Sequence, residues 1–66
     1  MQVILNGETR DVPHGQTVAA LLEQLGLAQK PVAVEVNLQL VPKQHHIAHV
    51  LAEGDRLEIV TLVGGG

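Results

Sequence analysis

The chain has 66 residues and a mass of 7.0 kDa, which corresponds to one small domain. Its net charge of −3 and its lack of Phe, Tyr and Trp argue against a general nucleic-acid-binding protein, which needs a basic face and stacking rings. The absence of cysteine excludes disulfide, thiolate-metal and thiol chemistry, and no apolar run approaches a membrane span, so we expect a soluble cytoplasmic protein.

The first twelve residues predict a β-hairpin. The apolar run Met1–Leu5 is followed by Asn6-Gly7, after which Glu8–Val12 forms the returning strand. Asn-Gly favours a two-residue turn, because both central residues of a type I′ turn need positive φ. Pro13 then ends the strand pattern.

One main helix is predicted over residues 17–25. Thr17 is the expected N-cap, because its hydroxyl can accept a hydrogen bond from a free N–H group of the first turn. Gly26 fits the position just beyond the helix, where a left-handed conformation is common. Apolar residues recur on one helical face, at Val18, Leu21, Leu22 and Leu25.

Three further strands follow the helix. They are predicted by the β-branched run Val32–Val36, the short run Gln39–Val41 and the long alternating run Arg56–Val63. A short helical turn is expected within residues 43–50, and Glu53-Gly54-Asp55 is a turn signal.

The order of these elements indicates a single α+β domain over residues 1–63. A mixed sheet of four to five strands would carry the one main helix packed across one face. This arrangement is the β-grasp, the fold of ubiquitin. The predicted core joins the apolar helix face to the inward strand residues Val3, Leu5, Val34, Val36, Leu57 and Ile59.

The last strand runs into three glycines, residues 64–66. Glycines cannot pack in a core and have high backbone freedom, so we expect a flexible tail. A tail without Cβ atoms is thin enough to thread a narrow channel of another protein. It would present the unhindered α-carboxylate of Gly66, which adenylation with ATP would convert into an electrophile for a sulfur or amine nucleophile.

Several short motifs occur in a specific order along the chain: Asn6-Gly7, Gly15-Gln16-Thr17-Val18, Leu21-Leu22, Val36-Asn37, Val41-Pro42, Glu53-Gly54-Asp55 and a terminal Gly-Gly. Through them the sequence resembles the ThiS family, the sulfur carriers of thiamine biosynthesis, over essentially its whole length. Each motif alone is weak, and their order and spacing make the resemblance specific. The third glycine, Gly64, departs from the common Gly-Gly ending and lengthens the tail.

The resemblance implies a mechanism. A ThiF-like adenylating enzyme would use ATP to activate the carboxylate of Gly66, with Gly64 and Gly65 threading its active site. Sulfur would then be installed as a C-terminal thiocarboxylate, and a ThiG-like thiazole synthase would accept it. The chain would be a carrier and a substrate, with no catalytic residue, bound cofactor or metal of its own.

Other functions share this terminal chemistry. A sulfur carrier for molybdopterin synthesis or tRNA thiolation would end in the same Gly-Gly. A ubiquitin-like modifier would instead join Gly66 to a lysine, so the fate of Gly66, thiocarboxylate or amide, separates the two classes. A β-grasp RNA-binding module is disfavoured by charge and composition, and a standalone enzyme by the little material left for pocket walls.

A partner surface is expected on the sheet face opposite the helix. If the predicted core residues point inward, Ile4, Val60 and Leu62 point outward, and parallel pairing of the first and last strands would gather them into an apolar patch. Acidic side chains near the tail in sequence, at Glu53, Asp55 and Glu58, could meet basic residues of a partner.

One histidine group has a spacing found in metal sites. His45 and His49 would share a face of a helix, with His46 beside them, but zinc would need further ligands from His14 or a carboxylate. Because the element is short, we interpret it as a solvated polar turn rather than a metal site.

Overall fold

The computed structural model describes residues 1–62, which form five strands, one α-helix and one short 3₁₀ helix. No helix in this part of the chain is long and apolar enough to cross a membrane. In chain order the elements are β1 (Gln2–Leu5), β2 (Glu8–Asp11), α1 (Val18–Gln24), β3 (Val32–Val36), β4 (Gln39–Leu40), the 3₁₀ helix η1 (Lys43–His45) and β5 (Arg56–Thr61).

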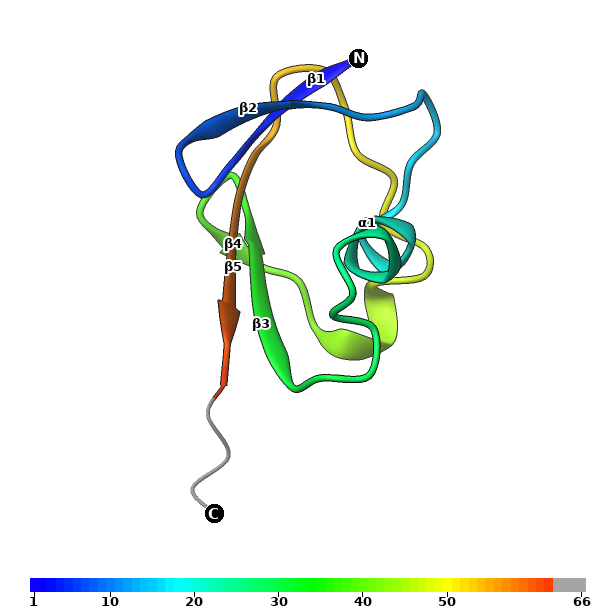
Figure 1. The fold of residues 1–66 in the computed structure, drawn as a ribbon, viewed down its shortest axis with the longest axis vertical. Coiled ribbons are helices and arrows are strands. Elements are labelled where there is room, and N and C mark those ends of the chain that lie inside the picture. Colours follow the sequence, from blue (N-terminus) through cyan, green and yellow to red (C-terminus); the bar gives the residue numbers. More distant parts are fainter. Residues whose placement is uncertain (63–66) are drawn as a thin grey trace.

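The strands form one mixed sheet in the order β2-β1-β5-β3-β4, and α1 lies across one of its faces (Figure 1). β5 is the central strand. It runs parallel to β1, with Leu57 opposite Leu5, and antiparallel to β3, with Leu57 also opposite Val36. The predicted α+β architecture, a mixed sheet with one helix on one face as in the β-grasp, is confirmed.

The predicted hairpin turn also ties β1 to the central strand. Asn6 and Gly7 have φ values of 49° and 85°, as a type I′ turn requires. The Asn6 side chain then hydrogen-bonds the backbone of Ile59 on β5, donating to its carbonyl at 3.2 Å and accepting from its N–H at 2.8 Å. This side chain therefore takes the place that a further residue of β1 would occupy beside β5.

Helix α1 begins and ends as its sequence predicts. Thr17 Oγ1 accepts a hydrogen bond from the Ala20 N–H at 3.1 Å. Beyond the helix, Gly26 has a φ of 75°, and the N–H of Leu27 donates to the Leu22 carbonyl at 2.8 Å. This is the Schellman arrangement, in which a left-handed glycine lets the chain reverse onto the last turn.

The core lies between α1 and the sheet. Two of the predicted core residues, Leu5 and Leu25, are only partly buried against it, because they lie at the ends of their elements. Residues outside the regular elements complete it, among them Leu51, which the strand and helix patterns did not indicate. The buried apolar residues are Val3, Val12, Val18, Leu21, Leu22, Val34, Val36, Val41, Leu51, Leu57 and Ile59.

Candidate functional site

The end of β5 leads to the three glycines. Thr61, the last residue of the strand, pairs with Val32, the first residue of β3. The chain therefore leaves the sheet at the end of the strands where β3 begins. Leu62 follows and donates its N–H to the Pro31 carbonyl at 2.8 Å. Residues 63–66 lie outside the described part of the chain. The predicted thiocarboxylate position Gly66 and the predicted threading residues Gly64 and Gly65 are among them.

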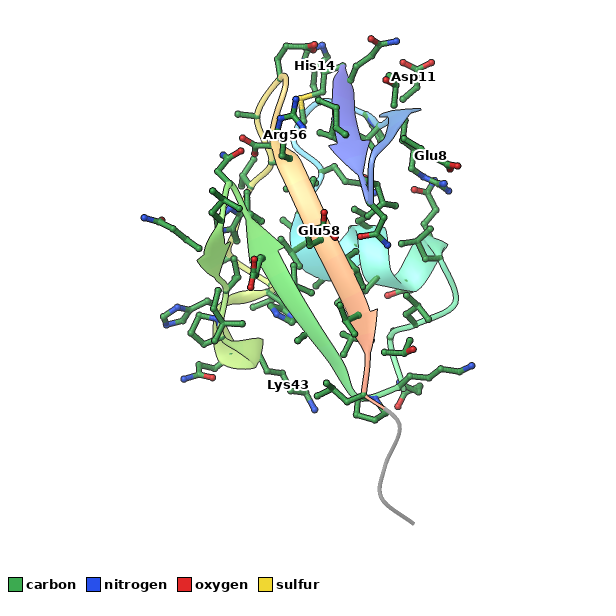
Figure 2. All side chains as sticks on the ribbon, turned by 90° about the vertical axis from the view of Figure 1, so that its left-hand side faces the viewer. Glu8, Asp11, His14, Lys43, Arg56 and Glu58 are labelled. Carbon is green, nitrogen blue, oxygen red and sulfur yellow. The ribbon has the colours of Figure 1, made fainter. Side chains whose placement is uncertain are left out.

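The sheet face away from α1 carries both charge and apolar side chains. Figure 2 looks onto this face, with Arg56 and Glu58 of β5 labelled. Glu58 lies directly opposite Glu35 of β3, and both side chains are exposed. Like charges in directly opposed positions destabilise a sheet, so this pair does not favour folding.

The predicted partner patch is divided by the register of the sheet. Ile4, half-buried, lies opposite Arg56 at the start of β5, whereas Val60, which is 56% exposed, lies four residues further along that strand. At the rise of a β-strand this separates the two by about 13 Å, with Glu58 between them. Leu62 lies beyond Val60 and is 51% exposed. The contact role of the three residues stays a prediction.

Two of the three acidic residues that are near the tail in sequence, Glu53 and Asp55, lie in the turn that precedes β5. Asp55 accepts hydrogen bonds from the Asn37 side chain at 2.9 Å and from the Ala52 N–H at 2.8 Å. Glu53 accepts from the Gln2 N–H at 2.9 Å. These carboxylates therefore organise the turn before β5, and the point where the chain leaves the sheet lies at the opposite end of the strand.

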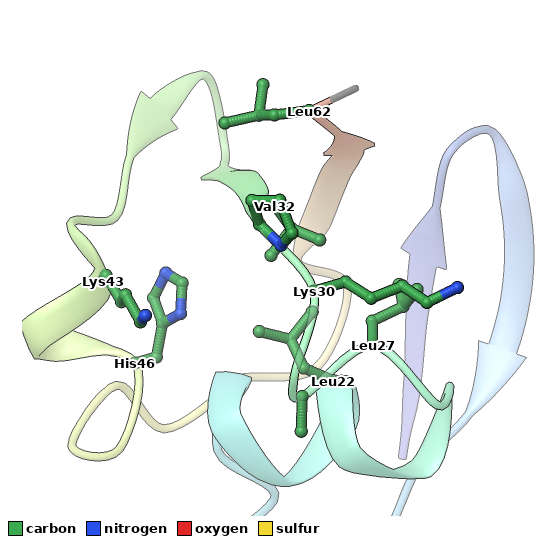
Figure 3. Close-up of a pocket in the computed structure, with 9 residues that line it drawn as sticks. Leu22, Leu27, Lys30, Val32, Lys43, His46 and Leu62 are labelled. Carbon is green, nitrogen blue, oxygen red and sulfur yellow. The ribbon is translucent and has the colours of Figure 1, made fainter. Parts of the chain in front are cut away.

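An apolar groove begins beside Leu62, between α1 and the segment that holds η1 (Figure 3). One hollow of about 240 Å³ lies between Leu22, Leu27, Val32 and Leu62 and is bordered by Lys30 and Lys43. A second hollow of about 180 Å³ shares Leu22, Lys43 and His46 with the first and extends to Ile47. We call the two hollows together the α1–η1 groove.

The walls of the α1–η1 groove are fastened to each other by backbone hydrogen bonds. Helix α1 begins with N–H groups that have no partner inside the helix. The N–H of Val18 donates to the His49 carbonyl and that of Ala19 to the His46 carbonyl, both at 3.0 Å. The segment that follows Lys43 and includes the groove residue His46 is thereby fixed against the start of the helix.

The three neighbouring histidines have different surroundings. His46 is 7% exposed, and its Nε2 lies 2.9 Å from the Val41 carbonyl, to which it must donate because a carbonyl only accepts. His45 is exposed and His49 half-buried. The prediction of a solvated turn is therefore wrong for His46, whose ring packs in the space between η1 and the core.

Metal binding gains no support from this segment. Among residues 1–62, no group of three or more His, Cys, Asp or Glu side chains is placed to hold a metal ion. His14, the further ligand considered from the sequence, is exposed in the turn before α1.

Sequence reasoning missed the two lysines of the groove. Lys30 precedes Pro31 after the helix, and Lys43 opens η1, thirteen positions later. The sequence does contain a signal that could have drawn attention to them. They are the two lysines of the chain, and each stands next to a proline. Only the folded chain shows that both border one groove.

Comparison with known proteins gives consistent results along the whole chain. The model of the ThiS family matches residues 3–66. "Sulfur carrier protein ThiS" of Escherichia coli (strain K12) is 35% identical over 66 residues, covering 100% of both chains. The crystal structure of a thiamine biosynthesis protein (ThiS) from Geobacter metallireducens superposes with a TM-score of 0.84 at 30% identity, again over 100% of both chains.

A second group of relatives is longer. "Thiazole synthase" of Paramagnetospirillum magneticum (strain ATCC 700264 / AMB-1) is 46% identical over 66 residues, which are 100% of this chain and 20% of that protein. "Thiazole synthase" of Magnetococcus marinus (strain ATCC BAA-1437 / JCM 17883 / MC-1) is 42% identical with the same coverage. The chain thus spans about a fifth of the length of these relatives, which contain a segment like it within a larger polypeptide.

Proposed function

The chain belongs to the ThiS family, the sulfur carriers of thiamine biosynthesis, and we propose that it bears its sulfur as a thiocarboxylate on Gly66. The observation that carries the proposal is the likeness to a sulfur carrier over the full length of both chains, in sequence and in fold. The fold supports it by placing the strand that precedes the glycines at the centre of the sheet.

The chemistry of the proposal needs no catalytic side chain from this protein. A carboxylate oxygen of Gly66 attacks the α-phosphorus of ATP, and pyrophosphate leaves. A sulfur nucleophile then attacks the carbonyl carbon of the acyl adenylate, and AMP leaves with one of the original carboxylate oxygens. The net change is exchange of one oxygen for one sulfur, with Gly64 and Gly65 forming the narrow segment that enters the partner.

Two partners follow from this chemistry. A ThiF-like adenylating enzyme would bind the ATP and activate the carboxylate, and a ThiG-like thiazole synthase would accept the sulfur; two relatives that bear the name thiazole synthase support the second. We propose that a partner contacts apolar side chains on and beside the outer sheet face, at Ile4, Val60 and Leu62. We place the reaction in the cytoplasm, where ATP is available.

The proposal is tested by the intact mass of the protein after incubation with ATP, sulfide and the cognate adenylating enzyme. The expected increase equals the mass difference between sulfur and oxygen, and a variant lacking Gly65 and Gly66 should not show it. Oxidation of Met1, the single methionine, adds almost the same mass, so fragment spectra must assign the change to the C-terminal peptide.

Other outcomes of the same experiment would replace the proposal. An AMP adduct that gains no sulfur but is captured by lysines would indicate a ubiquitin-like modifier. A thiocarboxylate that thiazole synthase does not accept would favour a carrier for tRNA thiolation or molybdopterin synthesis. An unchanged mass with an active partner would mean that Gly66 is not the reacting position.

A further inference from the structure

We propose that the α1–η1 groove binds a segment of thiazole synthase in which an apolar side chain adjoins one or more carboxylates. The inference rests on the proposed function, since it assumes that thiazole synthase receives Gly66. It adds a docking surface on the helix side of the domain, which shares Leu62 with the contacts proposed on and beside the outer sheet face.

The groove is suited to an apolar side chain. Its two hollows share residues and form one depression, with the exposed side chains Leu62 and Ile47 at its two ends. Leu62 is 51% exposed and Ile47 is 77% exposed, so burying both against a partner would remove apolar surface from water. The floor is formed by Leu22 and the buried ring of His46.

The charges at the groove select an acidic occupant. Lys30 and Lys43 are the two lysines of a chain whose net charge is −3, and both border the first hollow (Figure 3). None of the chain's seven acidic residues lines either hollow. The groove is therefore a basic, apolar site on an acidic protein, and a carboxylate beside the inserted side chain would complement it.

The short distance from the groove to the reacting position makes a tail-accepting protein its natural occupant. Gly66 is only four positions beyond Leu62, which lies at the end of the groove. A fully extended chain of that length spans at most about 14 Å. A protein whose active site holds Gly66 must therefore approach within that distance of Leu62, which is close enough for its surface to reach the adjoining end of the groove.

The choice of thiazole synthase rests on the longer relatives. Two proteins that bear this name contain a segment similar to the whole chain. In such a polypeptide the carrier-like segment and the synthase remain together, so a direct contact between the two surfaces is expected. The backbone hydrogen bonds that hold the segment just after η1 against α1 mean that the groove exists before binding, which lowers the entropic cost of docking.

The experiment measures binding of the full chain to the cognate thiazole synthase by titration calorimetry. Lys43→Glu should weaken binding about five- to tenfold, because it replaces an attraction with a repulsion. Arg10→Glu is the matched control: it changes the charge equally at an exposed position of β2, away from the groove, and should leave the dissociation constant within about twofold.

A second pair of variants tests the acidic character of the occupant at one position. Ile47→Glu and Ile47→Gln replace the same exposed apolar side chain with two side chains of nearly equal size and shape, so the two variants differ mainly in charge. An acidic occupant predicts that Ile47→Glu weakens binding more than Ile47→Gln by several-fold. Thermal melts of the four variants serve to show that each is folded.

The results separate this inference from the function on which it rests. Equal binding of thiazole synthase by Lys43→Glu and Arg10→Glu, or by the two Ile47 variants, would overturn the proposed role of the groove. The mass experiment would still show a thiocarboxylate in that case. A loss of adenylation by Lys43→Glu with unchanged binding to thiazole synthase would also overturn the proposed role of the groove. A wild-type chain that is never thiocarboxylated would overturn the proposed function itself.

Discussion

The two hairpin turns of the sheet have the same backbone form but differ in their second residue. Asn6-Gly7 joins β1 to β2, and Asn37-Leu38 joins β3 to β4; all four residues have positive φ, from 49° to 85°. In both turns the asparagine side chain accepts a hydrogen bond from a backbone N–H of β5; Asn6 also donates to the Ile59 carbonyl, and Asn37 donates to the carboxylate of Asp55 in the turn before β5. The second position is a glycine in one turn and a leucine in the other.

The leucine in the second turn shows that the backbone conformation there is not optimised for folding. A leucine in the left-handed region costs roughly 1–2 kcal/mol more than it would in the right-handed region, and Leu38, with φ of 69°, is 90% exposed, so burial does not offset this cost. Glycine at the equivalent position of the first turn avoids the cost. The first turn is thus the better optimised of the two.

The largest effect is expected from Asn6→Ala. This change removes both hydrogen bonds to Ile59 and places an alanine at φ of 49°, and we expect a loss of about 2–3 kcal/mol in the free energy of unfolding, measured by urea denaturation. Asn6→Gly keeps the conformation and loses only the hydrogen bonds. A glycine variant as unstable as the alanine variant would show that strain makes no contribution.

A smaller loss is expected when the first turn is made to resemble the second. Gly7→Leu should lower the free energy of unfolding by about 1–2 kcal/mol, because leucine tolerates a φ of 85° poorly. An added Cβ at this position meets no atom within 4 Å, so the effect reports conformation and not a clash. Unchanged stability in urea would mean that the turn adjusts its backbone to accept a side chain.

The reciprocal change should be stabilising and smallest. Leu38→Gly is expected to raise the free energy of unfolding by about 0.5–1 kcal/mol, since relief of the left-handed strain exceeds the greater freedom of glycine in the unfolded chain. Thermal melting at fixed protein concentration measures the shift. A lower melting temperature would show that Leu38, despite its exposure, contributes contacts to the folded state.

Local patterns predicted most of the elements. The Asn-Gly turn, the Thr17 cap, the glycine after the helix and the run Val32–Val36 each depend on residues close in sequence, and the structure contains all of them. The last strand is correctly placed from Arg56, and its assigned end is Thr61.

Long-range contacts account for what the patterns missed. Ile4, Val60 and Leu62 were expected to gather into one apolar patch, but the register that sets Ile4 opposite Arg56 places Ile4 and Val60 apart along the sheet, and the contact role of the three stays a prediction. His46 was expected in solvent, but its hydrogen bond to Val41 and its position beneath η1 bury it. Neither register nor burial follows from residues adjacent in sequence.

By itself the sequence determined the order of the strands and the helix, the glycines that follow the last strand, and the resemblance to sulfur carriers, because these depend on spacing, turn chemistry and periodicity along the chain. Tertiary structure alone decided that Asn6 extends the pairing of β5 by bonding Ile59, fifty-three residues away, and that both lysines border one groove. The reason is physical: hydrogen bonds and hollows form between segments that only the packing of α1 on the sheet brings together.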